Sequence, residues 1–258
     1  MVLLSFDTEE FDVPLEHSVD LSMPEQMKIS GIGLGRILDV LEKEKVTATF
    51  FCTANFASNS PDLMQRIVSG GHEVASHGYY HSYFEVQHLR ESKEKLEEIT
   101  GKPVTGYRQA RMMPVDENEI CAAGYTYNSS INPTFIPGRY MNFREKCTPY
   151  LKSGVWQIPV SVVPYVRFPL FWLSCHNLPM SLYLSLCKYA YRHYGYYTVY
   201  FHPWEFVDLN KNPEWKLPFI VRHNSGEPMC KKLAQIIGAF KQENAVFGTY
   251  SEFIREMK

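Results

Sequence analysis

Short strand-like runs alternate with helical segments along most of this chain, and that alternation is the feature that most constrains its fold. The runs are rich in β-branched and aromatic residues, and several of the stretches between them have helical periodicity. We expect strands at residues 2–7, 46–53, 72–76, 104–107, 125–129, 156–162, 197–202 and 245–249. The pattern is typical of βα units around a parallel sheet or barrel, so the sequence predicts an α/β fold.

Four of the helical segments are bounded by recognisable start or stop signals. Ser60 and Pro61 form a capping residue and a first-turn proline, and Gly70 follows the last apolar position of that helix. Asp116 begins another helix, with Glu119 three residues later in the manner of a capping box. We therefore expect helices over residues 60–70, 88–100, 116–124 and 228–243.

Length and composition fit one globular domain over residues 1–258. The chain is 45% hydrophobic and 21% charged, which is enough apolar material for a sizeable core. Residues 132–154 contain several prolines and glycines and are expected to form a long loop or an insertion. Residues 164–195 are expected to form an apolar, lid-like segment.

That apolar segment has two interpretations. It contains no run of the roughly 18 uncharged apolar residues that a spanning helix needs, because Pro169, His176, Asn177 and Pro179 interrupt its most apolar stretch, residues 168–187. It is either a buried or lid-forming part of the domain or a surface that meets a lipid-linked substrate. The second interpretation predicts a peripheral contact with a membrane.

The charge of the chain indicates which partners to expect, and its cysteines and first residues indicate a cellular compartment. Lys and Arg total 26 against 28 Asp and Glu, so the formal net charge is -2. Because no basic block is present, we expect no nucleic-acid partner. The six cysteines lie far apart without a CxxC pair, and the first residues enter a strand-like run without a basic leader. We therefore expect reduced thiols and a cytoplasmic protein, and the sequence does not indicate an oligomeric state.

His77 and His81 are the strongest local candidates for chemistry. They follow the expected strand 72–76 and are four residues apart, so on a helical turn they would lie on the same face and could bind one metal ion. The spacing alone is weak support, because a chain with nine histidines contains such pairs by chance. Two unrelated surface histidines are the simpler alternative.

Reactive side chains also follow three other expected strands. Asp7, Glu9 and Glu10 lie at the end of the first strand, Arg108 follows strand 104–107, and His202 closes strand 197–202. Each has a structural alternative: a solvated turn for the glutamates, an ion pair for Arg108 and a buried core histidine for His202. Asp7 directly follows an apolar run, so its charge must be paired or functional. Because parallel folds place reactive groups at the carboxyl ends of strands, four such ends favour a common site.

With these residues the sequence resembles the polysaccharide deacetylases of the NodB-homology type, also called carbohydrate esterase family four. The resemblance covers roughly residues 1–131 and 197–207, and it implies a distorted (β/α)7-type barrel with fewer than eight regular units. Five motifs carry it, in the order typical of the family: Ser5-Phe6-Asp7-Thr8-Glu9, Ser76-His77-Gly78-Tyr79-Tyr80-His81, Tyr107-Arg108-Gln109-Ala110-Arg111, Tyr127-Asn128-Ser129-Ser130 and Tyr200-Phe201-His202.

The resemblance implies metal-dependent hydrolysis of the N-acetyl amide bond of an N-acetylated sugar. His77 and His81 would hold the metal, and Asp7 would be the general base that takes a proton from water. His202 would protonate the departing amine, and Arg108 would orient Asp7. The backbone N–H of Arg111, in the third motif, would help to stabilise the oxyanion.

Two of the motifs depart from the family pattern in ways that change the assignments. Thr8 stands where the family has a second aspartate as a metal ligand. In a variant class the ligand comes two residues after the base, which makes Glu9 the third ligand, with Glu10 as the fallback. Gln109 and Ala110 replace the usual prolines of the third motif, which weakens the oxyanion assignment.

The fourth motif also departs from the pattern. Asn128 replaces the aspartate that normally orients the acid histidine, so Glu205 or Asp208 would take over that role. We expect Asn128, Trp204 and Tyr79 on the substrate side of the site, where the two rings could stack on a sugar. Ordinary core or rim packing is the alternative for both rings.

Two imidazoles and one carboxylate suit zinc, and cobalt, nickel or manganese fit the same ligand set. A carbohydrate is the expected partner, and a precursor in cell-surface glycan synthesis is the substrate we expect by analogy. Two other functions remain open: hydrolysis of small cyclic amides or ureides on the same fold, and carbohydrate binding with weak or no turnover.

Overall fold

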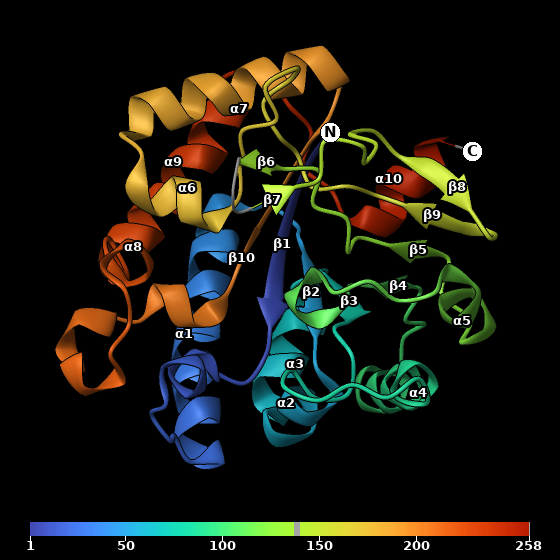
Figure 1. Cartoon of the computed structure of the whole chain (residues 1–258), viewed down its shortest axis with the longest axis vertical. Coiled ribbons are helices and arrows are strands. Elements are labelled where there is room, and N and C mark those ends of the chain that lie inside the picture. Colours follow the sequence, from blue (N-terminus) through green and yellow to red (C-terminus); the bar gives the residue numbers. More distant parts are fainter. Residues whose placement is uncertain (137–139, 258) are drawn as a thin grey trace.

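The computed structural model describes residues 1–136 and 140–257 (Figure 1). Its strands are β1 (Val2–Thr8), β2 (Thr49–Cys52), β3 (Glu73–Ser76), β4 (Gly106–Tyr107), β5 (Tyr127–Asn128), β6 (Phe135–Ile136), β7 (Tyr140–Met141), β8 (Tyr150–Lys152), β9 (Val155–Gln157) and β10 (Tyr197–Phe201). Its α-helices are α1 (Met23–Glu44), α2 (Ala54–Asn59), α3 (Pro61–Ser69), α4 (His88–Thr100), α5 (Glu117–Ala122), α6 (Trp172–Asn177), α7 (Met180–Tyr194), α8 (Phe219–Arg222), α9 (Glu227–Lys241) and α10 (Tyr250–Met257). Short 3-10 helices are η1 (Val13–His17), η2 (Ala110–Met112), η3 (Pro203–Phe206), η4 (Leu209–Lys211) and η5 (Pro213–Trp215).

One curled sheet organises the molecule. Its strand order is β10-β1-β2-β3-β4-β5-β9-β8, and all neighbours are parallel except β8 and β9. The chain after β9 then approaches β10, because the backbone N–H of Thr198 donates to Ser161 Oγ at 2.9 Å. Seven parallel strands in a curled row confirm the predicted α/β fold of the distorted (β/α)7 type.

The two faces of β1 show why the candidate base points inward. Val2, Leu4 and Phe6 belong to the main core between the sheet and the helices, whereas Leu3 belongs to a second apolar cluster. Side chains alternate along a strand, so Asp7 lies on the same face as Leu3, at the carboxyl end of the strand. The apolar face of α10 packs against this second cluster.

Helix α1 is the largest element that the sequence patterns did not predict. A capping box between Ser22 and Glu25 begins it, with the hydroxyl of Ser22 donating to the Glu25 carboxylate at 2.6 Å. Glycines at positions 31, 33 and 35 are poor helix formers and obscure its periodicity. The helix nevertheless buries an apolar stripe against the sheet, so tertiary packing outweighs its weak local propensity.

Gly33 is where α1 touches the segment that carries His202. A Cβ built on Gly33 would lie 1.8 Å from the carbonyl oxygen of Pro203, in η3. We expect Gly33→Ala to destabilise the fold by about 1–3 kcal/mol through overpacking. Gly35→Ala is the matched control: its Cβ would meet nothing closer than 4.0 Å, so a gain of up to about 1 kcal/mol is expected. Urea unfolding of both variants checks this, and equal effects would contradict the close contact.

The predicted strand at residues 245–249 needs correction, and the structure adds detail to two other predicted segments. Residues 245–249 form an isolated parallel bridge between Val2 and Phe247 rather than a strand. The segment 132–154 contains β6, β7 and β8, although its residues 137–139 lie outside the described residues. The segment 164–195 divides in two, because Trp172 lines the candidate site while α7 packs its buried face on the main core. Among residues 1–136 and 140–257, no helix combines the length and apolarity needed to cross a bilayer.

Candidate active site

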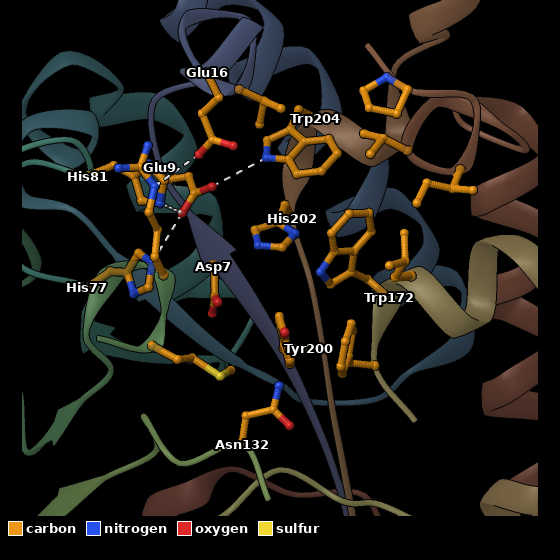
Figure 2. A pocket seen from close by; sticks show the side chains of 18 of the residues that line it. Asp7, Glu9, Glu16, His77, His81, Asn132, Trp172, Tyr200, His202 and Trp204 are labelled. Atoms are coloured by element: carbon orange, nitrogen blue, oxygen red, sulfur yellow. Dashed lines mark hydrogen bonds and ion pairs between the residues drawn. The ribbon is translucent and has the colours of Figure 1, made fainter. Parts of the chain in front are cut away.

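A cleft of about 520 Å³ lies where the parallel strands end (Figure 2). The parallel arrangement brings the carboxyl ends of β1, β3 and β10 to the same edge of the sheet, although they are far apart in sequence. Seven of the predicted site residues line this cleft: Asp7, Glu9, His77, His81, Arg111, His202 and Trp204.

Glu9, His77 and His81 converge at one end of the cleft. Glu9 Oε2 lies 3.1 Å from His77 Nε2 and 3.1 Å from His81 Nε2, and the ligand atoms of all three side chains lie within 4.8 Å of one another. The two imidazole rings are stacked, with centroids 5.8 Å apart. The structure thus brings together the three residues that were predicted as ligands.

The contacts behind these residues orient them as a ligand set. His77 Nδ1 donates to the backbone carbonyl of Arg108 at 2.8 Å, which turns Nε2 toward Glu9. His81 Nδ1 lies 2.8 Å from Asp12 Oδ2, which turns its Nε2 the same way. The indole N–H of Trp204 donates to Glu9 Oε1 at 3.3 Å. Carboxylate and carbonyl groups behind metal-bound imidazoles are typical of zinc sites, so these residues fit a divalent cation.

The electrostatics of the cluster also favour a bound cation. Burial would raise the pKa of Glu9, but the neighbouring His81, His202 and His77 lower it to about 2. Burial would lower the pKa of His81, but Glu9 and Asp12 raise it to about 9. The raised pKa of His81 reflects the negative charge of Glu9 and Asp12, which a divalent cation bound at the cluster would balance.

Asp7 is held by a fully buried arginine. Arg108 Nη1 donates to Asp7 Oδ1 at 2.5 Å and to Ser5 Oγ at 3.0 Å, and its remaining nitrogens donate to Ser129 and Tyr250. Burial would lower the pKa of Arg108, but the charge of Asp7 raises it, so the guanidinium stays charged. Arg108 does not line the cleft itself, but it positions the Asp7 carboxylate, which does.

His202 lies between aromatic side chains, on the other side of the cleft from His77 and His81 (Figure 2). Its ring is stacked on Trp204 with centroids 4.8 Å apart and meets Trp172 edge-on at 5.4 Å. Its Nδ1 lies 2.9 Å from Glu205 Oε1. Burial would lower the pKa of His202, but Glu9 and Glu205 raise it, which favours the protonated ring. Glu205 thus contacts the histidine in the way predicted for a substitute of the missing aspartate.

Arg111 reaches the cleft through an unusual backbone conformation. Its φ is 56° and that of Met112 is 50°, both in the left-handed region that side chains disfavour. Its guanidinium lies 3.1 Å from Asp12 Oδ2 and 3.2 Å from Glu16 Oε1. Strained backbone of this kind is common at functional sites and places Arg111 at the rim of the cleft.

Two predicted substrate residues lie elsewhere, and both expectations need correction. Asn128 does not line the cleft, because its amide donates to Gln157 Oε1 at 2.9 Å and its carbonyl accepts from Ser130. Tyr79 packs against Tyr80 and His88 and faces a different hollow beside α4. Local motif spacing does not determine toward which side of a loop a side chain points.

The two fallback carboxylates are also used elsewhere. Glu10 accepts hydrogen bonds from Thr53 and Asn55 and does not line the cleft. Asp208 accepts from the backbone N–H of Asn210 at 3.2 Å.

Sequence reasoning missed Asp12 and several polar residues that line the cleft. Asp12 is buried and lies between His81 and Arg111, where its carboxylate contacts both. Its one sequence signal was an acidic residue five positions after Asp7 in a short apolar stretch. The missed polar residues of the cleft come from η1 and from the chain on either side of β6 and β7, and their positions carried no motif: Glu16, His17, Asn132 and Asn142.

Comparisons with known sequences point to the polysaccharide deacetylases. Residues 33–112 match the sequence profile of the polysaccharide deacetylase family. The chain is 31% identical over 64 residues to the peptidoglycan-N-acetylmuramic acid deacetylase PdaA of Bacillus subtilis, covering 25% of this chain and 24% of the relative. It is 47% identical over 45 residues to a chitooligosaccharide deacetylase of a Bradyrhizobium strain, covering 17% of this chain and 20% of the relative. The chain therefore spans a quarter or less of the length of these two relatives.

The fold has close counterparts among solved structures. The structure of a probable polysaccharide deacetylase from Pseudomonas aeruginosa PAO1 superposes with a TM-score of 0.68 and 16% identity. The superposition covers 98% of this chain and 89% of the other. This chain therefore has a fold like that of the polysaccharide deacetylases, and its residues 33–112 match the profile of that family.

Proposed function

We propose that the protein hydrolyses the N-acetyl amide bond of an N-acetylated sugar and releases acetate. Glu9, His77 and His81 would hold a divalent cation, with zinc the best match to one carboxylate and two imidazoles. When bound, the cation supplies Lewis acidity that polarises the amide carbonyl and acidifies water. The convergence of these three ligand atoms beside Asp7 and His202 is the observation that carries the proposal.

Asp7 and His202 would divide the proton transfers between them. Asp7, held by Arg108, would accept a proton from the attacking water. His202, whose pKa is raised mainly by Glu9 and Glu205 against the effect of burial, would donate a proton to the amine nitrogen as the C–N bond breaks. Arg111 lies at the rim, where its backbone N–H would face the developing oxyanion.

The residues that line the cleft favour a substrate in which the sugar is attached to an apolar group. Trp172 and Trp204 offer ring faces for a sugar, and Phe171, Leu173 and Ile220 continue from the cleft into a neighbouring apolar groove of about 200 Å³. A lipid-linked N-acetylated sugar would place its sugar near the ligand cluster and its apolar group along this groove.

An acetate-release screen tests the function. The panel contains N-acetylglucosamine, chitin and peptidoglycan oligosaccharides, and the methyl and octyl glycosides of N-acetylglucosamine. We expect zinc-dependent acetate release from at least one sugar, with loss after chelation and recovery when zinc is restored. The octyl glycoside should have the lower KM of the two glycosides because the groove covers its chain.

The same screen separates the alternatives. A cyclic ureide and a cyclic amide are included, and turnover of these without acetate release from any sugar would replace the proposal by the second hydrolytic function. Sugar binding by calorimetry without turnover, in zinc-loaded protein, would indicate a carbohydrate-binding protein. Equal KM values for the two glycosides would remove the apolar group from the proposal and leave the deacetylase activity intact.

A further inference from the structure

A buried row of polar groups leads away from His202 into the protein. Glu205 Oε1 lies 2.9 Å from His202 Nδ1, and Glu205 Oε2 lies 2.9 Å from His176 Nε2. His176 Nδ1 lies 2.6 Å from the backbone carbonyl of His223. The side chains of Glu205 and His176 are fully buried, and His176 is one of the polar residues that interrupt the apolar segment 164–195. A carboxylate between two imidazoles needs an explanation that core packing does not supply.

The hydrogen-bond partners determine how many protons the row holds. A carbonyl oxygen only accepts, so His176 Nδ1 must donate to the carbonyl of His223. The hydrogen bond between His176 Nε2 and Glu205 Oε2 requires another proton between them, whichever atom carries it. Both placements give the pair of Glu205 and His176 a net charge of zero. The net charge is the same whether a cationic imidazole faces an anionic carboxylate or a neutral imidazole faces a protonated carboxyl.

The second oxygen of Glu205 sets the orientation of His202. Glu205 Oε1 accepts from the backbone N–H of His202 at 2.6 Å and faces its Nδ1 at 2.9 Å. Trp172 and Trp204 hold the ring from two sides. With Nδ1 committed to Glu205, the ring nitrogen left for chemistry in the cleft is Nε2.

We propose that His176 is a positioning residue for the deacetylation proposed above, sharing one proton with Glu205 so that a neutral pair, rather than a bare carboxylate, backs His202. The neutral pair fixes the ring orientation of His202 without binding its acidic proton too tightly. A bare buried carboxylate in the same place would hold the imidazolium strongly and make it a poorer acid at neutral pH.

Several other titratable or charged groups lie near the row, and the variants described below do not alter them. The negative charges of Glu9, directly after β1, and of Asp7, in β1, both raise the pKa of His202. The elements packed against His176 and Glu205 contribute Cys175 in α6, Lys232 in α9, whose ammonium donates to the carbonyl of Cys175, and Arg36 in α1, whose guanidinium donates to the carbonyl of Phe206.

The first test uses the unaltered protein and needs no turnover. NMR of protein with ¹⁵N-labelled histidine reports which ring nitrogens carry protons between pH 5 and 9. We expect His176 Nδ1 to be protonated throughout, and neutral His202 to carry its proton on Nδ1. A proton on Nε2 of neutral His202, or none on His176 Nδ1, would overturn the proposal. Failure to find any deacetylated sugar leaves this result readable, so the two proposals fail separately.

The second test gives the pair a negative charge in one variant and leaves it uncharged in the other. His176→Gln keeps a donor to Glu205 but cannot hold a positive charge, so Glu205 becomes a bare carboxylate and favours the protonated form of His202. The alkaline limb of kcat/KM, where His202 loses its proton, should move up by about one pH unit or more. Glu205→Gln leaves the pair uncharged, with a neutral His176, so it should move that limb less than His176→Gln does.

His193→Gln is the matched control, because this exposed histidine lies on α7 away from the cleft. It should leave the limb in place. The ring titration of His202 by NMR in the same three variants gives the shifts without an activity assay. An unchanged limb and an unchanged titration in folded His176→Gln protein would show that His176 only fills space.

Discussion

Replacing Asp7 with Asn is expected to reduce acetate release by about 10²–10⁴-fold while the protein keeps its metal. The amide has nearly the shape of the carboxylate but cannot accept the proton, and the ligand cluster of Glu9, His77 and His81 is not altered. Acetate release and metal content are measured on the same preparation. Undiminished turnover would remove Asp7 from the role of base.

The Asp7→Asn variant needs a stability control because it leaves a buried charge behind. Arg108 is fully buried and Asp7 is its only carboxylate partner among the described residues, so the loss could cost about 3–5 kcal/mol. The assay is therefore run well below the Tm of the variant. Glu16→Gln makes the same chemical change at another carboxylate of the cleft, one whose ion pair is with Arg111, and should retain most of the activity.

Replacing His77 with Ala is expected to remove the metal and the activity together. The variant deletes one of three ligands, and metal affinity should fall by more than the roughly 10–100-fold that is typical for losing a group behind a ligand. Metal analysis of the purified protein and zinc titration against a chelating dye measure the loss. A stoichiometric ion in His77→Ala would place the metal elsewhere.

A graded series makes this experiment sharper. Asp12→Asn alters a group behind His81 that also pairs with Arg111, and it leaves the three ligands in place. Zinc affinity should therefore fall by about 10–100-fold and lie between the values for His77→Ala and the unaltered protein. His193→Ala removes an exposed imidazole from α7 and should leave the affinity unchanged. A uniform loss across the series would point to general destabilisation rather than to a ligand set.

Local chemistry in the sequence was sufficient to predict the fold class and the polar ends of the strands. Period-two apolar runs specify strands, and a charge directly after such a run, as at Asp7, has to lie at the end of a strand near other polar groups. The parallel order of strands was implied by the helices between them. This is why residues 7, 9, 77, 81 and 202, separated by up to 195 positions, were predicted together and lie in one cleft.

Only the tertiary structure decided which side chains face the cleft and which groups support them. Asn128 and Tyr79 belong to the right motifs but point into other contacts, because the direction of a side chain in a loop depends on what packs against it. Asp12 and His176 carry no motif, since a residue behind a ligand or an acid has to be near it only in space. A motif contains only residues that are close in sequence. The contacts between distant segments form when the sheet curls, so they depend on the tertiary structure.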